Sequence, residues 1–196
     1  MLFRSVASLR VGPATDPGTR VGPLVDAEAR ERVLRFVEIG RTQARTVAAV
    51  APDPALAARG WYVGPHVFAD VDPHGPLGQE EIFGPVLAVF RARDFSAAVA
   101  LANDTPYALT AGVFSRSPAH LEQARSALEA GNVYLNRGIT GALVHRQPFG
   151  GYRLSGIGSK AGGPDYLQQF VVPRVVTENT LRRGFAPQRQ PGGRPG

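Results

Sequence analysis

The sequence predicts an α/β fold built on a parallel sheet. Three short apolar runs, at residues 86–90, 109–114 and 133–135, are typical of strands that are buried on both faces. Two stretches with helical periodicity, at residues 95–102 and 118–130, lie between them. This alternation of strands and helices favours right-handed crossovers, which would place the three strands parallel in one sheet.

Before this unit, the sequence predicts a loop and a long helix. Residues 10–25 are rich in Gly, Pro and Asp, which favours a loop. Asp26 is a suitable N-cap for a helix over residues 27–42. The apolar face of this helix is predicted to contain Val33, Leu34 and Val37.

Shorter elements are predicted on either side of the helix and strand alternation. Strands are expected at residues 46–50 and within 60–71, followed by a loop over 72–79. In the alternating unit, Ser117 is expected to cap the second helix and Gly131 to end it.

The C-terminal part of the chain is predicted to contain the ligand site, a last strand and a tail. Ligands of parallel sheets bind beyond the carboxyl ends of the strands. The glycine-rich residues 136–163 follow such an end, so we expect the site there. Residues 170–177 are rich in β-branched side chains and predict a strand. Residues 186–196 cannot form a core, and we expect a disordered tail.

Composition excludes several classes of protein. Of 196 residues, 43% are hydrophobic and 19% are charged, so the chain can bury a core and is not expected to be disordered. It has no apolar run of membrane length and no secretory signal, so we expect a cytoplasmic protein without a membrane partner. Cysteine is absent, which excludes disulfides, thiolate metal sites and a cysteine nucleophile within this chain.

The formal net charge of +6 does not indicate nucleic-acid binding. Of the 22 basic residues 21 are Arg, they are scattered, and no basic stretch alternates with aromatic residues. The four histidines lack the spacing of metal ligands, so we expect no metal site and place each of them in a loop or on the surface. GIGSKA at residues 156–161 fits a loose dinucleotide fingerprint, but no apolar strand precedes it and GGP would break the following helix.

Two other motifs carry candidate site residues. In EEIFGP at residues 80–85, Glu81 and Phe83 lie in a turn before a predicted strand, where they could face a cofactor. The alternative is a capped turn with Phe83 in the core. The glycines of QPFGG at 147–151 and of SG at 155–156 allow a close backbone approach, or else a tight crossover loop.

In order along the chain, these motifs resemble the C-terminal half of an aldehyde dehydrogenase. The resemblance spans residues 10–186 and rests on EIFGP at 81–85, GVFS at 112–115, GNVYLN at 131–136 and PFGG at 148–151. Further motifs resemble the subgroup that oxidises L-glutamate γ-semialdehyde, also called Δ1-pyrroline-5-carboxylate dehydrogenase. They are NRGITGA at 136–142, RQPF at 146–149, KAGGPDYL at 160–167 and TENT at 177–180.

The resemblance implies an incomplete parallel-sheet catalytic domain over residues 6–185, with an oligomerisation strand at about 170–180 that joins a partner subunit in a homodimer. The family oxidises aldehydes with NAD, through a cysteine nucleophile and a glutamate general base. Neither is in the matched segment, so no catalytic residue is assigned here, and we expect this chain to be a fragment that is inactive alone.

The resemblance also implies roles for five residues. Glu81 would bind the nicotinamide ribose hydroxyls, since a carboxylate accepts two hydrogen bonds, and Phe83 would pack beside the nicotinamide. Gly141 and Ala142 would anchor the substrate carboxylate through backbone N–H groups. Phe149 would form part of an aromatic wall around the aliphatic chain of the substrate.

Three alternatives stay open at this point. The parent enzyme could act on another aldehyde. The chain could be a non-catalytic short form that pairs with a full-length enzyme through its last strand. It could also be a basic module of unrelated function.

Overall fold

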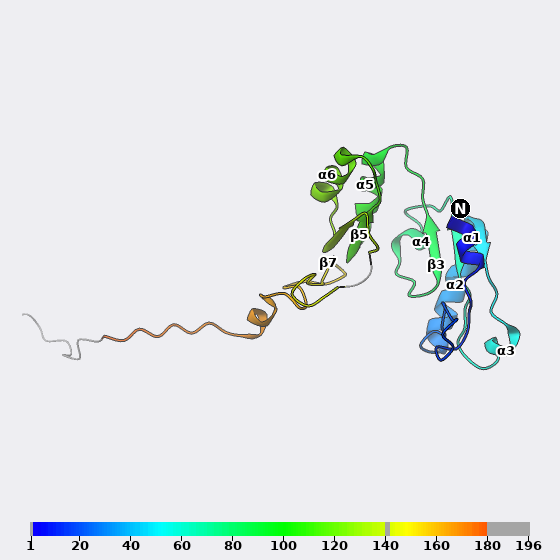
Figure 1. Cartoon of the computed structure of the whole chain (residues 1–196), viewed down its shortest axis with the longest axis horizontal. Coiled ribbons are helices and arrows are strands. Elements are labelled where there is room, and N and C mark those ends of the chain that lie inside the picture. Colours follow the sequence, from blue (N-terminus) through cyan, green and yellow to red (C-terminus); the bar gives the residue numbers. More distant parts are fainter. Residues whose placement is uncertain (1, 140–141, 180–196) are drawn as a thin grey trace, which may run out of the picture.

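The computed structural model describes residues 2–139 and 142–179, which form two lobes and an extended C-terminal segment (Figure 1). The first lobe spans residues 2–90 and is built on a sheet of order β1-β2-β3, in which β1–β2 is antiparallel and β2–β3 is parallel. Its elements are α1 (Leu2–Ala7), α2 (Ala27–Gln43), β1 (Arg45–Ala49), α3 (Pro54–Ala57), β2 (His66–Ala69), α4 (Pro76–Gln79) and β3 (Val86–Val89).

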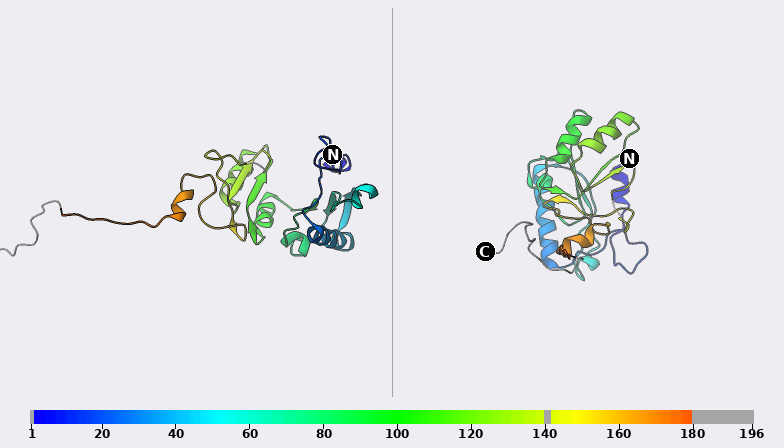
Figure 2. Two further views of the ribbon diagram at one scale, coloured as in Figure 1. Left: turned by 90° about the horizontal axis from the view of Figure 1, so that it is seen from below. Right: turned by 90° about the vertical axis from the view of Figure 1, so that its left-hand side faces the viewer.

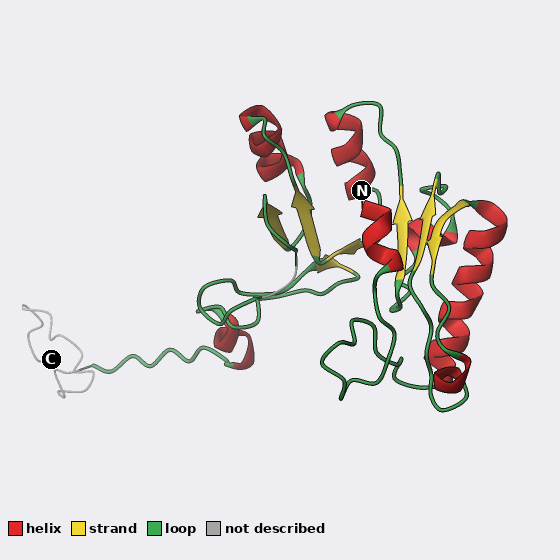
Figure 3. Cartoon of the chain, turned by 45° about the vertical axis from the view of Figure 1, so that its right-hand side comes forward, coloured by secondary structure: helices red, strands yellow, loops and turns green. Residues whose placement is uncertain are grey.

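The helix α2 packs on the sheet of the first lobe (Figure 3). As predicted, Asp26 caps it, accepting a hydrogen bond of 2.7 Å from the Ala29 backbone N–H. Gly40 allows close contact with the sheet, because a Cβ there would lie 2.4 Å from the ring of Phe68. The predicted buried face was wrong in one residue, since Leu34 is exposed and Phe36 takes its place in the core.

The core of this lobe lies between α2 and β2. Its fully buried side chains come from these two elements: Val33, Phe36, Val37, Val67 and Phe68. His66 is buried as well, contrary to the predicted surface or loop position, and its Nδ1 lies 2.8 Å from the Gly64 carbonyl. Burial lowers the pKa of His66 below its ordinary value.

Two further predictions for this lobe were wrong in detail. The predicted loop at 72–79 contains the short helix α4. The strand β3 is only half-buried, with Leu87 exposed, because β3 lies at the edge of the sheet.

The second lobe, residues 95–165, contains the predicted strand–helix–strand crossover. Strands β5 and β6 pair in parallel, and α6 connects them. Ser117 caps α6, accepting a hydrogen bond of 3.4 Å from His120 N–H. The elements are α5 (Phe95–Asn103), β4 (Tyr107–Ala108), β5 (Thr110–Val113), α6 (Pro118–Ala127), β6 (Asn132–Leu135) and β7 (Tyr152–Arg153).

The prediction of one three-stranded parallel sheet was wrong. The edge of β3 is taken by β2, in parallel pairing, so β3 does not share a sheet with β5 and β6. The partner of β3 lies 20 residues earlier in the sequence, since His66 pairs with Val86. The local alternation of strands and helices does not reveal such a pairing.

The C-terminal segment extends away from both lobes (Figure 2). A short 3-10 helix, η1 (Tyr166–Phe170), precedes residues 171–179, which are exposed and form no strand within the part of the chain described. The strand predicted at 170–177 is therefore not formed among the residues that the structure describes. The predicted tail at 186–196 lies outside the described residues. Across the described ranges, no helix has both the length and the apolarity needed to cross a membrane.

Candidate functional site

The turn that contains Glu81 and Phe83 follows α4 and rests against α2. Gly84 makes this contact possible, because a Cβ there would lie 2.4 Å from the side chain of Val33. Phe83 has a left-handed backbone conformation, with φ of 52°, and is 71% exposed. The alternative with Phe83 in the core is therefore wrong. A strained backbone that presents an exposed ring is a feature of functional sites.

Glu81 is exposed and borders a cavity of about 270 Å³ between the lobes. The second lobe supplies the rest of this cavity, from the end of α5, from residues 107–111 and from Glu129, Ala130 and Ser155. Glu81 is thus the residue of the first lobe that faces the second lobe across this space.

The second candidate region is the loop between β6 and β7. Ala142 is exposed on it, and Gly141 lies outside the described residues. Phe149 is half-buried, and its backbone forms two hydrogen bonds with Ala161, of 2.9 and 2.8 Å. This pairing holds the Phe149 loop, residues 142–151, against the segment that follows β7.

Asn132 of β6 fixes the end of the Phe149 loop. Its side-chain amide donates to the Pro148 carbonyl at 2.9 Å, and its side-chain oxygen accepts from the Gly150 N–H at 3.3 Å. Lys160 Nζ donates to the Gly150 carbonyl at 2.7 Å. These three bonds determine where the backbone next to Phe149 lies.

The predicted close backbone approach is present in this loop. A Cβ on Gly131 would lie 1.8 Å from the Gly150 carbonyl oxygen, so a glycine is required there. The neighbour that Gly150 approaches is the start of β6. The close approach is thus between two backbone segments of this chain.

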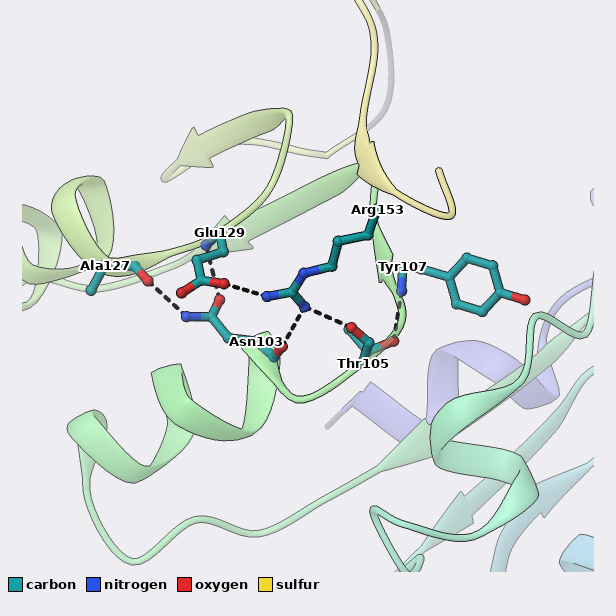
Figure 4. Close-up of polar contacts among 6 residues, drawn as sticks. All are labelled: Asn103, Thr105, Tyr107, Ala127, Glu129 and Arg153. Carbon is teal, nitrogen blue, oxygen red and sulfur yellow. Dashed lines mark hydrogen bonds and ion pairs between the residues drawn. The ribbon is translucent and has the colours of Figure 1, made fainter. Parts of the chain in front are cut away.

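Arg153, which the sequence did not single out, connects three segments of the second lobe (Figure 4). Its guanidinium donates to the carbonyls of Asn103 and Thr105, both at 2.6 Å, and forms an ion pair with Glu129. Arg153 has a left-handed φ of 54°. Arg153 lies between the PFGG and SG motifs, but no sequence pattern indicated that its side chain contacts other segments.

Asn103 connects α5 to the end of α6. Its side chain donates to the Ala127 carbonyl at 2.7 Å and accepts from the Glu129 N–H at 2.9 Å. These bonds cap α6, which ends at Ala127, three residues earlier than predicted.

The four predicted site residues that the structure describes do not share either of the two hollows near them. Glu81 borders the cavity between the lobes, whereas Phe83, Ala142 and Phe149 are absent from its walls. A larger hollow of about 690 Å³ lies beside β6 and the 158–165 loop, and the four described candidates do not line it. Neither of these two hollows therefore brings the Glu81 turn and the Phe149 loop together.

Comparison with known proteins shows what the chain is similar to. The sequence profile described as "Aldehyde dehydrogenase family" matches residues 1–176. The 1-pyrroline-5-carboxylate dehydrogenase of Geobacillus sp. (strain WCH70) is 46% identical over 170 residues, which is 87% of this chain and 32% of that protein. The enzyme of the same name from Bacillus subtilis is 45% identical over 171 residues, 87% of this chain and 33% of that protein.

Solved structures agree with this assignment. Proline utilization A from Bdellovibrio bacteriovorus has a TM-score of 0.87 at 48% identity, covering 96% of this chain and 19% of that one. A 1-pyrroline-5-carboxylate dehydrogenase from Thermus with bound NAD has a TM-score of 0.79 at 46% identity, covering 85% and 32%. The chain thus spans about a third of the curated relatives. On the sequence match and the shared fold, this chain belongs to the aldehyde dehydrogenase family.

Proposed function

We propose that this chain is part of an NAD-dependent enzyme that oxidises L-glutamate γ-semialdehyde to L-glutamate, a step of proline catabolism. The observation that carries the proposal is the identity of 46% to a 1-pyrroline-5-carboxylate dehydrogenase over 87% of the chain. The subgroup motifs at residues 136–142 and 160–167 support the same substrate.

The Glu81 turn fits the nicotinamide end of NAD. Glu81 is exposed, so its carboxylate can accept hydrogen bonds from two ribose hydroxyls. Phe83 presents an exposed ring that can pack beside a flat heterocycle. NAD, when bound, supplies the hydride acceptor. This chain would orient the ribose through Glu81 and cover one side of the nicotinamide ring through Phe83.

The Phe149 loop fits the substrate side. The backbone N–H groups of Gly141 and Ala142 would bind the carboxylate without the entropy cost of a mobile side chain. Phe149 would contact the methylene groups of the substrate. The bonds from Asn132 and Lys160 hold the backbone on the C-terminal side of this loop in one position.

The chemical step needs groups outside this sequence. The chain contains no cysteine, so a thiolate nucleophile must come from another part of the enzyme. The catalytic contribution of this chain is therefore binding and orientation, and we expect the isolated chain to be inactive.

A chimera tests the proposal. The aligned 170 residues of the Geobacillus enzyme are replaced by the matching residues of this chain, and NADH formation is measured with L-glutamate γ-semialdehyde. We expect turnover with this substrate and none with the isolated chain. Glu81→Gln in the chimera is expected to raise KM for NAD, because an amide accepts at only one oxygen.

The specificity of the chimera decides between this substrate and another aldehyde. Ala142 replaced by a bulky residue is expected to impair turnover of the carboxylated aldehyde while short neutral aldehydes are unaffected. A folded chimera that oxidises neutral aldehydes but not the carboxylated one would contradict the proposed substrate.

We also propose that the parent enzyme is a homo-oligomer, with residues 170–180 adding a strand to a partner subunit. The support is the exposure of residues 172–178, which form no strand within the described part of the chain and whose Val172 and Val175 are 92% and 89% exposed. The cytoplasmic location stays a prediction.

A further inference from the structure

We propose that the turn at residues 103–105 is a junction that aligns the cofactor turn of Glu81 with the substrate loop of Phe149. Gln79 and Arg153 are the positioning residues that attach these two surfaces to it. The inference rests on the proposed function, because it concerns how the two binding surfaces of that enzyme are held in relation to each other.

Three consecutive backbone carbonyls of this turn are bound by the two side chains. Arg153 donates to the carbonyls of Asn103 and Thr105, each at 2.6 Å. Gln79 donates to the carbonyl between them, that of Asp104, at 2.7 Å. One turn therefore receives side chains from both lobes at adjacent peptide groups.

Gln79 attaches the Glu81 turn. It is the last residue of α4 and lies two residues before Glu81 in the sequence. The same amide nitrogen also donates to the Pro73 carbonyl at 2.7 Å, so it joins the first lobe to the second. His74 Nδ1 lies 3.4 Å from Asp104 Oδ2, which is a second contact between the two lobes.

Arg153 attaches the Phe149 loop. It follows Phe149 by four residues, and its neighbours are bound to the chain just after the turn. Leu154 N–H donates to the Pro106 carbonyl at 3.1 Å, and Ala108 N–H donates to Ser155 Oγ at 3.0 Å. The ion pair with Glu129 orients the guanidinium from the opposite side (Figure 4).

The chemistry of the two side chains suits a rigid link. Both hydrogen bonds to the turn come from Arg153 Nη1, whose two N–H groups are fixed in the plane of the guanidinium, so this one nitrogen can reach two carbonyls while Nη2 pairs with Glu129. A hydrogen bond from a charged donor is stronger than one between neutral groups. The junction also borders the cavity of Glu81, since Asn103 and Thr105 line it. Movement of the turn would change the space in front of Glu81.

Hydrogen exchange on the full 196-residue chain tests the junction. Arg153→Gln is expected to speed amide exchange about tenfold at Thr105, Tyr107 and Ala108, and also across the boundary at Gln79 and Glu80. Gln79→Glu, which replaces a donor amide by a carboxylate of the same shape, is expected to speed exchange at Thr105, Tyr107, Ala108 and Leu154. Arg125→Gln is the matched control, because its partner Glu122 lies on the same exposed helix.

Enzyme kinetics in the chimera separate positioning from folding. Arg153→Gln is expected to raise KM for both NAD and the aldehyde several-fold while kcat changes little, and Arg153→Lys to restore part of the loss. A purely structural role would lower the amount of active enzyme and leave both KM values unchanged, which would contradict the proposal.

The exchange experiment does not depend on activity, so failure of the proposed function leaves it intact. The junction is refuted if Arg153→Gln speeds exchange only in the second lobe, with Gln79 and Glu80 at the wild-type rate. If circular dichroism shows that the Arg153→Gln variant is unfolded, the Arg153→Lys and Gln79→Glu variants are used instead. Their exchange rates are compared with wild type on both sides of the boundary, in the turn that follows Asp104 and at Gln79 and Glu80. Faster exchange on both sides of the boundary, with no change in Arg125→Gln, supports the junction.

Discussion

At the scale of single residues, burial separates the aromatic side chains that stabilise the fold from the one that is available to a ligand. Phe68 is fully buried between the sheet and α2, whereas Phe83 is 71% exposed in a left-handed turn. The sequence marks both as apolar. The structure adds that Gly84, beside Phe83, packs closely on Val33 while Phe83 itself lies outside the core.

We predict opposite effects for these two phenylalanines. Phe68→Ala is expected to lower the free energy of unfolding by about 3–5 kcal/mol, because it leaves a cavity in the core. Phe83→Ala is expected to change it by less than about 0.5 kcal/mol, as for an exposed side chain. Urea denaturation measures both, and KM for NAD in the chimera is expected to rise only for Phe83→Ala. Equal destabilisation by the two variants would contradict the assignment of Phe83 to a ligand surface.

At the scale of elements, α2 and the α6 crossover are the parts that local signals describe well. Asp26 and Ser117 cap the two helices as their residue types indicate. The close packing of α2 on β2 depends in addition on Gly40, which has no role in the periodic pattern.

We predict that Gly40→Ala destabilises the protein. The added Cβ would lie 2.4 Å from the Phe68 ring, and the cost of this overlap, about 1–3 kcal/mol, exceeds the gain in helix propensity of about 0.5–1 kcal/mol. Gly22→Ala is the control, since a Cβ there meets no atom within 4 Å. Thermal unfolding followed by circular dichroism compares the two, and a Gly40→Ala variant as stable as wild type would show that the helix can move away from the sheet.

At the scale of the whole molecule, the described C-terminal segment exposes four valine side chains. Val171, Val172, Val175 and Val176 are all at least 66% exposed along the extended segment. Backbone groups in an extended, exposed segment are free to pair with another strand. This arrangement supports the proposed homo-oligomer.

We predict that the segment mediates self-association of the full chain. Val172→Lys with Val176→Lys, which alter the same face of a strand, are expected to shift the chain toward monomer in sedimentation velocity experiments. Val25→Lys is the control, because Val25 is 86% exposed but lies in the first lobe. An unchanged sedimentation profile in the double variant would exclude the segment as the interface.

The sequence by itself determined the helices α2, α5 and α6, the β5–α6–β6 crossover and the family, and it supplied the candidate residues, because caps, periodicity and motifs depend on residues that are close in the chain. Only the tertiary structure decided that β3 pairs with β2, that Phe83 points outward and that Gln79 and Arg153 meet at one turn. Strand pairing and burial depend on segments far apart in the sequence, which compete for the same edge or core. Local sequence patterns do not indicate which of these distant segments pairs with a given strand or packs in the core.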